Sequence, residues 1–214
     1  MDYLARLLVA ALVAFISGLL STISGGGYGT ILTPALVLLG YDLSVAVPCS
    51  LISQVASNIS IMLAYHRSGI TRASLRPEDL RITVLMASCG LAGVVMAFLA
   101  LVSLPSLAIK VYVGSVVILV GILVLLGKSW VGGRRASLAR LIAISVVSAF
   151  NKCVSGGGYG PLLSGGQVLS GVGVRRALLR TLLAGLVVCI GGTIIYLALG
   201  TSIDIALTLS ASAG

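Results

Sequence analysis

A six-residue motif that occurs twice is the part of this 214-residue sequence best suited to bind a ligand. Residues 24–29 and 155–160 both read Ser-Gly-Gly-Gly-Tyr-Gly, 131 positions apart, and each copy interrupts an apolar stretch. Glycine disfavours a helix by about 1 kcal/mol relative to alanine, so three in succession predict that the backbone leaves the helix at both places. Amide groups at such a turn, beside the start of a helix, attract negative charge. The two motifs therefore predict an anion-binding site.

Lys152 adds a positive charge three residues before the start of the second motif at Ser155, inside an apolar segment. A charge at membrane depth costs at least about 2.5 kcal/mol, so it needs a partner or a purpose. All five carboxylates of the chain fall at expected helix ends or in loops, which leaves an anionic substrate as the natural counter-charge. The alternative is that Lys152 reaches water along the wall of a cavity.

The predicted binding site combines the backbone of both motifs with polar side chains nearby. Its members are Gly25, Gly26, Gly27, Tyr28, Gly29, Thr30, Thr33, Gln54, Asn58, Asn151, Lys152, Ser155, Gly156, Gly157, Gly158, Tyr159 and Gly160. No nucleophile with a base partner and no cluster of metal-ligand residues stands out in the sequence. We therefore predict no catalytic residue, no metal and no cofactor.

The composition requires that these residues be positioned by membrane helices. Mean hydropathy is +1.18, 58% of the residues are hydrophobic and only 9% are charged, as in integral membrane proteins. The net charge is +9, but the basic residues gather between apolar segments, as the positive-inside rule predicts, rather than on a surface for nucleic acid. The expected fold is an all-α polytopic membrane protein in the cell membrane.

The duplicated motif predicts two homologous repeats, each with a helix broken by glycine. At the same offset, residues 31–33 match 162–164 and Gly40 matches Gly171. We assign residues 1–127 to a first membrane repeat, 128–140 to a basic cytoplasmic linker and 141–214 to a second repeat. Paired breaks in two halves indicate the substrate site of a transporter. The alternative is that the glycines only let helices pack closely.

The apolar stretches predict helices over 7–23, 31–39, 45–65, 82–102, 107–126, 141–154, 162–169 and 174–199, giving about six to seven membrane segments. The third of these carries a polar stripe at helical spacing, formed by Ser50, Ser53, Gln54, Ser57 and Asn58. Such a stripe faces the protein interior or a cavity rather than lipid. Hydrogen bonding between helices and the lining of a pore both fit it.

The basic loops 66–81 and 127–140 are separated by two helices and so share one side, which the charge rule places in the cytoplasm. If each broken segment crosses the membrane once, the repeats are parallel, and Arg175, Arg176 and Arg180 lie near the external face against that rule. Either the short half-helices are re-entrant, or these arginines serve something other than topology.

Both repeats resemble the TauE/SafE sulfite-exporter permease family, over essentially residues 5–205. The likeness rests on Gly-Gly-Gly-Tyr-Gly in each half, on the run from Pro161 to Gly171 (Pro-Leu-Leu-Ser-Gly-Gly-Gln-Val-Leu-Ser-Gly), and on residues 176–177 and 181–182. The resemblance implies a multi-pass permease of typically eight helices that moves sulfur-containing anions such as sulfite, sulfonates or sulfoacetate. Glu78-Asp79-Leu80 resembles Ile203-Asp204-Ile205, so by the arithmetic of the repeat most of the seventh helix and all of the eighth would lie beyond Gly214.

The leading hypothesis is a secondary transporter for a small sulfur-containing oxyanion held at the two breaks near the membrane midplane, working by alternating access. Its partners would be the anion, the lipid bilayer and a second copy or another protein that supplies the missing helices, with no nucleic acid. A non-transporting membrane subunit or assembly factor on the same scaffold is the second reading. An intramembrane enzyme is the third.

Overall fold

The computed structural model describes residues 3–24, 27–69, 77–126, 138–201 and 203–213. Its helices are α1 (Tyr3–Ser24), α2 (Tyr28–Leu38), α3 (Leu43–Arg67), α5 (Pro77–Ser103), α6 (Ser106–Leu126), α7 (Leu138–Ser155), α8 (Tyr159–Leu169), α9 (Val174–Ala198) and α10 (Ile205–Ala213). The described residues contain no strand. The prediction of an all-α fold is confirmed.

Four of the described helices are long and apolar enough to cross a membrane. They contain the stretches Leu4–Thr22, Leu43–Arg67, Pro77–Ser103 and Val174–Ala198. Shorter apolar stretches follow at Tyr28–Leu38, Ser106–Val116 and Leu141–Ser155. Large apolar side chains such as Leu8, Leu12 and Val95 are exposed on the outside of the bundle, as a lipid-facing surface requires.

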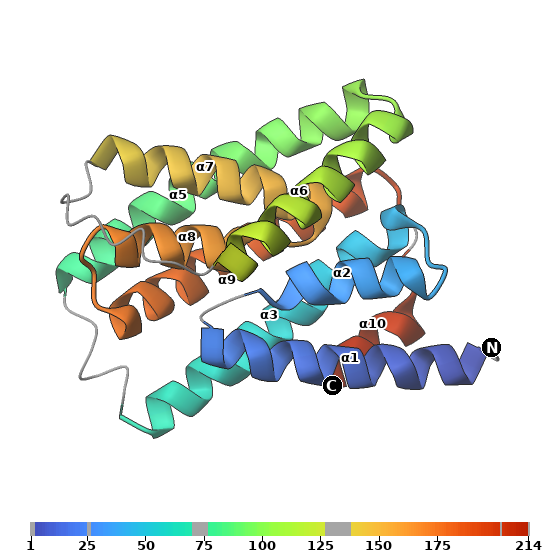
Figure 1. The fold of residues 1–214 in the computed structure, drawn as a ribbon, viewed down its shortest axis with the longest axis horizontal. Helices are drawn as coiled ribbons and strands as arrows, with labels where there is room; N and C mark the ends of the chain where they lie inside the picture. Colours follow the sequence, from blue (N-terminus) through green and yellow to red (C-terminus); the bar gives the residue numbers. More distant parts are fainter. Residues whose placement is uncertain (1–2, 25–26, 70–76, 127–137, 202, 214) are drawn as a thin grey trace.

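The first half-helix, α2, runs back along α1 instead of continuing it (Figure 1). A Cβ added to Gly18 would lie 4.0 Å from the Tyr28 ring, and one added to Gly40 would lie 3.7 Å from the Arg6 guanidinium. The start of α2 thus sits beside the later part of α1, and its end sits beside the beginning of α1. Gly27 permits the reversal with φ of +117°, a value that favours glycine.

The second half-helix, α8, folds back along α7 in the same way (Figure 1). Gly158, which precedes α8, contacts the Asn151 side chain late in α7, while an added Cβ on Gly166 would lie 2.9 Å from Ile144, two turns earlier in α7. Both glycine breaks therefore reverse the direction of the chain, as the re-entrant alternative expects. Each half-helix returns towards the end of the bundle from which its preceding helix started.

This reversal explains the arginines that the charge rule had left in conflict. Arg180 forms an ion pair with Asp79, which places the start of α9 beside the start of α5. His66, at the end of α3, lines one hollow together with Leu182 and Leu183, which lie early in α9. We call this end, which carries Arg67, Arg81, Arg175 and Arg176, the basic end. At the opposite end, Asp42 and Leu43 lie near Leu101, Ser106 and Leu199.

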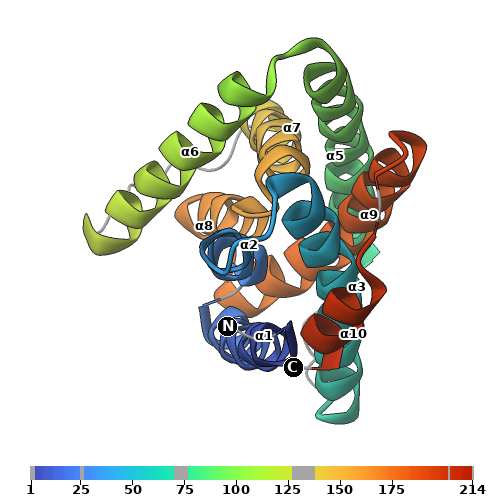
Figure 2. The same cartoon turned by 90° about the vertical axis from the view of Figure 1, so that its right-hand side faces the viewer.

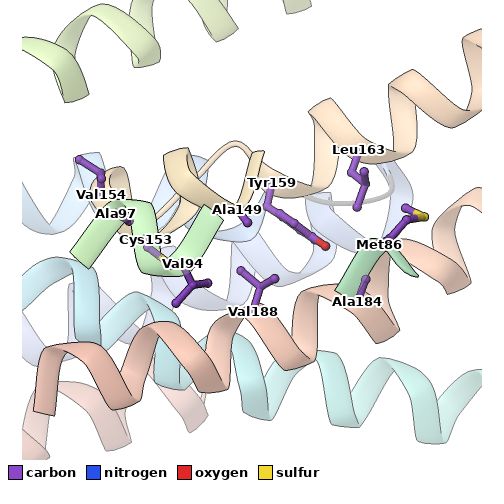
Figure 3. Packing of buried hydrophobic residues seen from close by; sticks show 10 residues of the cluster. All are labelled: Met86, Val94, Ala97, Ala149, Cys153, Val154, Tyr159, Leu163, Ala184 and Val188. Atoms are coloured by element: carbon purple, nitrogen blue, oxygen red, sulfur yellow. The ribbon is translucent and has the colours of Figure 1, made fainter. Parts of the chain in front are cut away.

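Helices from each half of the chain pack against helices from the other half. α5 lies against α7 and α9, where Met86, Val94, Ala149, Tyr159 and Val188 belong to one buried cluster (Figure 3). α10 lies against α1 and α3, and the Tyr28 hydroxyl donates to the carbonyl of Ala211 over 3.0 Å. Figure 2 shows α6 projecting away from the bundle. A hollow of about 540 Å³ separates it from α2.

Candidate functional site

The two glycine breaks meet inside the bundle, and we call their contact the glycine junction (residues 29–30 with 155–158). A Cβ added to Gly29 would overlap the carbonyl oxygen of Gly156, and one added to Gly157 would lie 2.7 Å from Cα of Thr30. The Gly158 amide also donates to Oγ1 of Thr30 over 2.8 Å. Because backbone touches backbone, no larger residue fits at these positions without moving one break away from the other.

Lys152 lies within the junction and is 1% exposed. Its Nζ donates to the Gly156 carbonyl over 2.8 Å and to Oε1 of Gln54 on α3. The Gly156 carbonyl also accepts from the Ser50 hydroxyl over 3.2 Å. Among the described residues, the one ion pair joins Arg180 to Asp79, and Lys152 has no carboxylate partner. The hydrogen-bond acceptors of its ammonium there are therefore neutral. A buried charge held this way is incompletely compensated, and an anion would complete it.

A second network fixes the backbone just after Lys152. Asn151 donates from Nδ2 to the Gly157 carbonyl over 3.1 Å and accepts at Oδ1 from the Tyr112 hydroxyl of α6 over 3.2 Å. The Ser155 hydroxyl accepts from the Gly157 amide over 3.3 Å. These contacts hold the break in one shape and connect it to α6, the most peripheral helix.

Thr33 brings an unused polar atom to the junction. Its Oγ1 is fully buried, and the described residues offer it no hydrogen-bond partner. A Cβ added to Gly156 would overlap this oxygen and lie 3.1 Å from Cβ of Thr33. Buried hydroxyls are usually hydrogen-bonded, so this one is available to a bound ligand.

The junction is closed in this conformation. The cavity bordered by Gly29, Thr30, Ser155, Gly157 and Gly158 measures about 10 Å³, close to the minimum for one water molecule. The Gly156 amide donates to the Lys152 carbonyl, and the Gly157 and Gly158 amides donate to Ser155 and Thr30. Three amides that the sequence assigned to an anion thus donate within the protein, so none of them is free for a ligand in this conformation.

Two larger hollows approach the junction from the side of α6. The hollow of about 540 Å³ is lined by Thr33 and Pro34 together with Lys110. Another of about 420 Å³ is lined by Val154 and Tyr196, again with Lys110. Both lie towards the end opposite the basic end.

Some of the predicted site residues lie away from the junction. Tyr28 points towards α1 and α10. Tyr159 points into the cluster between α5 and α9 (Figure 3), and Asn58 lies beside it near Gly185. Gly27 has Pro161 as its nearest neighbour, and the Gly160 carbonyl accepts from Ser164. Gly25 and Gly26 lie outside the described residues.

Two contacts to the junction were missing from the predicted set. Ser50 belonged to the recognised polar stripe, one turn before Gln54, and that spacing could have added it. Tyr112 could not have been found, because no motif or polar stripe marks it in its largely apolar segment. Within the described ranges, no three His, Cys, Asp or Glu side chains come together as metal ligands would.

The comparisons with known proteins give one family. The model of the family described as "Sulfite exporter TauE/SafE" matches residues 10–214. No curated protein and no solved structure matches the chain.

Proposed function

This chain belongs to the sulfite exporter TauE/SafE family, and from that premise we propose that it is a secondary transporter for a small sulfur-containing oxyanion, such as sulfite or an organosulfonate, bound at the glycine junction. The observation that carries the proposal is Lys152, a fully buried ammonium whose hydrogen-bond acceptors are neutral. In a medium of low dielectric, the attraction between this ammonium and an oxyanion is far stronger than in water.

The bound anion would replace neutral acceptors with charged oxygens. One oxygen takes the place of Gln54 or of the Gly156 carbonyl on Lys152, and a second accepts from the Thr33 hydroxyl. Separation of the breaks frees the Gly158 amide, which in the closed conformation donates to Thr30 across the junction. The site thus forms as it opens, and its hydrogen-bond donors suit an acceptor-rich anion.

Movement of the anion would follow from two inverted repeats, α1–α6 and α7–α10, that exchange exposure of the junction between the two sides. Glycines with positive φ recur at the repeat offset of 131, at Gly27 and Gly158, Gly40 and Gly171, and Gly69 and Gly200. Thr83 and Thr208 donate to the carbonyls of Asp79 and Asp204 in the same way. In this arrangement the hairpin of α1 with α2 and the hairpin of α7 with α8 each enter and leave the membrane on one side, α3, α5, α6 and α9 cross it, and α10 begins a further crossing.

The basic end would face the cytoplasm of a cell whose plasma membrane holds the protein. Cysteines placed at Arg175 and Ser106, both exposed, test this orientation in a Cys89→Ala background, where the other native cysteines are buried. A membrane-impermeant maleimide added to intact cells should label Ser106→Cys and leave Arg175→Cys unlabelled until the membrane is opened. Labelling of Arg175→Cys in intact cells would reverse the orientation.

Uptake of labelled sulfite into liposomes that contain the purified 214-residue chain tests the function itself. We expect saturable uptake that an excess of unlabelled sulfite or a small organosulfonate suppresses, above the leak of protein-free liposomes. If a folded, reconstituted chain moves neither anion, it is better described as a non-transporting membrane subunit or assembly factor.

A further inference from the structure

Arg180 and Asp79 form a buried ion pair away from the glycine junction. The two residues are 6% and 2% exposed, and both Nε and Nη2 of the arginine donate to Oδ1 of the carboxylate. A buried ion pair seldom stabilises a fold more than apolar side chains of the same size would, so its presence calls for another role. The guanidinium binds a carboxylate here, and its planar set of donors fits other oxyanions equally well.

The position of Arg180 relative to the junction follows from the contacts that other residues of α9 make. A Cβ added to Gly192 would lie 2.9 Å from Sγ of Cys153, next to Lys152, and one added to Gly185 would lie 3.2 Å from the Tyr159 ring. Arg180 comes five residues before Gly185, about 7.5 Å nearer the basic end. It therefore stands between the junction and the basic end, on the helix that links them.

Two buried polar atoms of α8 lie beside the part of α9 that carries Arg180. The hydroxyl of Tyr159 and Oε1 of Gln167 are buried, with no hydrogen-bond partner among the described residues. The Gln167 amide donates to Thr181, the neighbour of Arg180, over 3.0 Å. Asn58 adds an amide beside Gly185. Buried polar atoms without partners are uncommon, and the two here belong to α8, which packs against α9.

Apolar side chains pack around the Tyr159 ring in the present conformation. Met86, Leu163 and Ala184 are at most 1% exposed and belong to the same cluster as Tyr159 (Figure 3). They come from α5, α8 and α9, and the Arg180–Asp79 pair joins α5 to α9 nearer the basic end. Opening this side requires α5 and α9 to part, which would also part the ion pair.

We propose that Arg180 is a second, inner binding position for the oxyanion, where the substrate replaces the Asp79 carboxylate as the anion passes between the junction and the basic end. This proposal rests on the proposed function. Asp79 keeps the guanidinium neutralised while the inner side is closed. The arriving anion takes over that task when α5 moves from α9.

The opposite end of the bundle has no such arginine at the matching place. Position 49, which lies 131 residues before Arg180, is Cys49, and position 204 corresponds to Asp79. Asp204 instead accepts from the Leu207 amide at the start of α10 over 3.0 Å. The inner position is therefore a property of one side only, and Asp204 supplies a matched control.

The test measures the half-saturating sulfite concentration separately from each side of oriented proteoliposomes. From the basic side, Arg180→Gln should raise this concentration about tenfold, and Arg180→Lys less, because lysine keeps the charge but loses the planar donor set. Asp79→Asn should lower it several-fold, because the competing carboxylate is gone while an amide of the same shape remains. From the opposite side, each value should stay within about twofold of the wild type.

Glu78→Gln, at the exposed neighbouring position, and Asp204→Asn should leave both values unchanged. If the variants reconstitute poorly, the shift of the unfolding temperature by sulfite in detergent gives the same ranking. Equal half-saturation values in wild type, Arg180→Gln and Asp79→Asn, with only the unfolding temperature lowered, would show a structural clamp and overturn the inner position. Absence of wild-type flux would instead overturn the proposed function.

Discussion

Replacing Lys152 with glutamine should lower the rate of sulfite uptake at low concentration by about 100-fold. Glutamine fills much of the same volume and keeps a donor for Gln54 and the Gly156 carbonyl, but it removes the positive charge at the junction. A hydrogen bond to a charged group contributes about 1.5–3 kcal/mol, and the upper part of that range corresponds to the expected factor. Initial rates of labelled sulfite uptake into liposomes, corrected for the amount of protein inserted, measure the effect.

Arg81→Gln is the control for this change, since it removes the same charge from an exposed position at the basic end. Its uptake should remain within about twofold of the wild type. Because the buried charge of Lys152 is only partly compensated, Lys152→Gln should also unfold at a temperature no lower than the wild type. Normal uptake by a well-folded Lys152→Gln protein would remove the ammonium from the binding site.

Replacing Gly29 with alanine should destabilise the protein and stop transport. The new methyl group would overlap the Gly156 carbonyl and crowd Nζ of Lys152, which lies 2.8 Å from the added Cβ. Insertion of a methyl group against backbone costs about 3 kcal/mol, or roughly 6–12 °C in unfolding temperature for a chain of this size. Thermal unfolding in detergent and sulfite uptake measure the two effects.

Gly165→Ala is the matched control, because Gly165 lies within α8 and nothing approaches its added Cβ within 4 Å. Alanine favours a helix over glycine by up to about 1 kcal/mol, so the unfolding temperature should stay the same or rise slightly. If Gly29→Ala and Gly165→Ala behaved alike, the close approach of the two breaks would be wrong.

The sequence predicted the helices well and their course poorly. Glycine triplets in apolar segments identify breaks, and the breaks between α1 and α2 and between α7 and α8 fall where the motifs lie. Helical propensity does not predict the direction of the chain after a glycine. The φ values of +117° at Gly27 and +82° at Gly158 are accessible to glycine, and such values occur in several kinds of turn that lead the chain in different directions. The direction of α2 and α8 depends on packing against α1 and α7, which no local pattern reports.

The candidate site was likewise recoverable only in part. Lys152 and Gln54 are conspicuous because polar groups are costly in an apolar segment, and the structure places them in contact. The two tyrosines occupy equivalent places in identical motifs, yet Tyr28 binds the Ala211 carbonyl whereas the Tyr159 hydroxyl lies unpaired in the described structure. That difference arises from distant helices, α10 in one case and α5 with α9 in the other.

The crosswise packing of α5 bears on how the chain is made. Its buried face rests on α7 and α9, which leave the ribosome well after α5, and Asp79 meets Arg180 across 101 positions of sequence. A nascent α5 must therefore wait in the membrane with a carboxylate and a small-residue surface uncovered. The first half therefore depends on the insertion machinery until α9 is made. A chain whose synthesis stops between α6 and α9 would not fold as an independent domain and would be a substrate for membrane quality control.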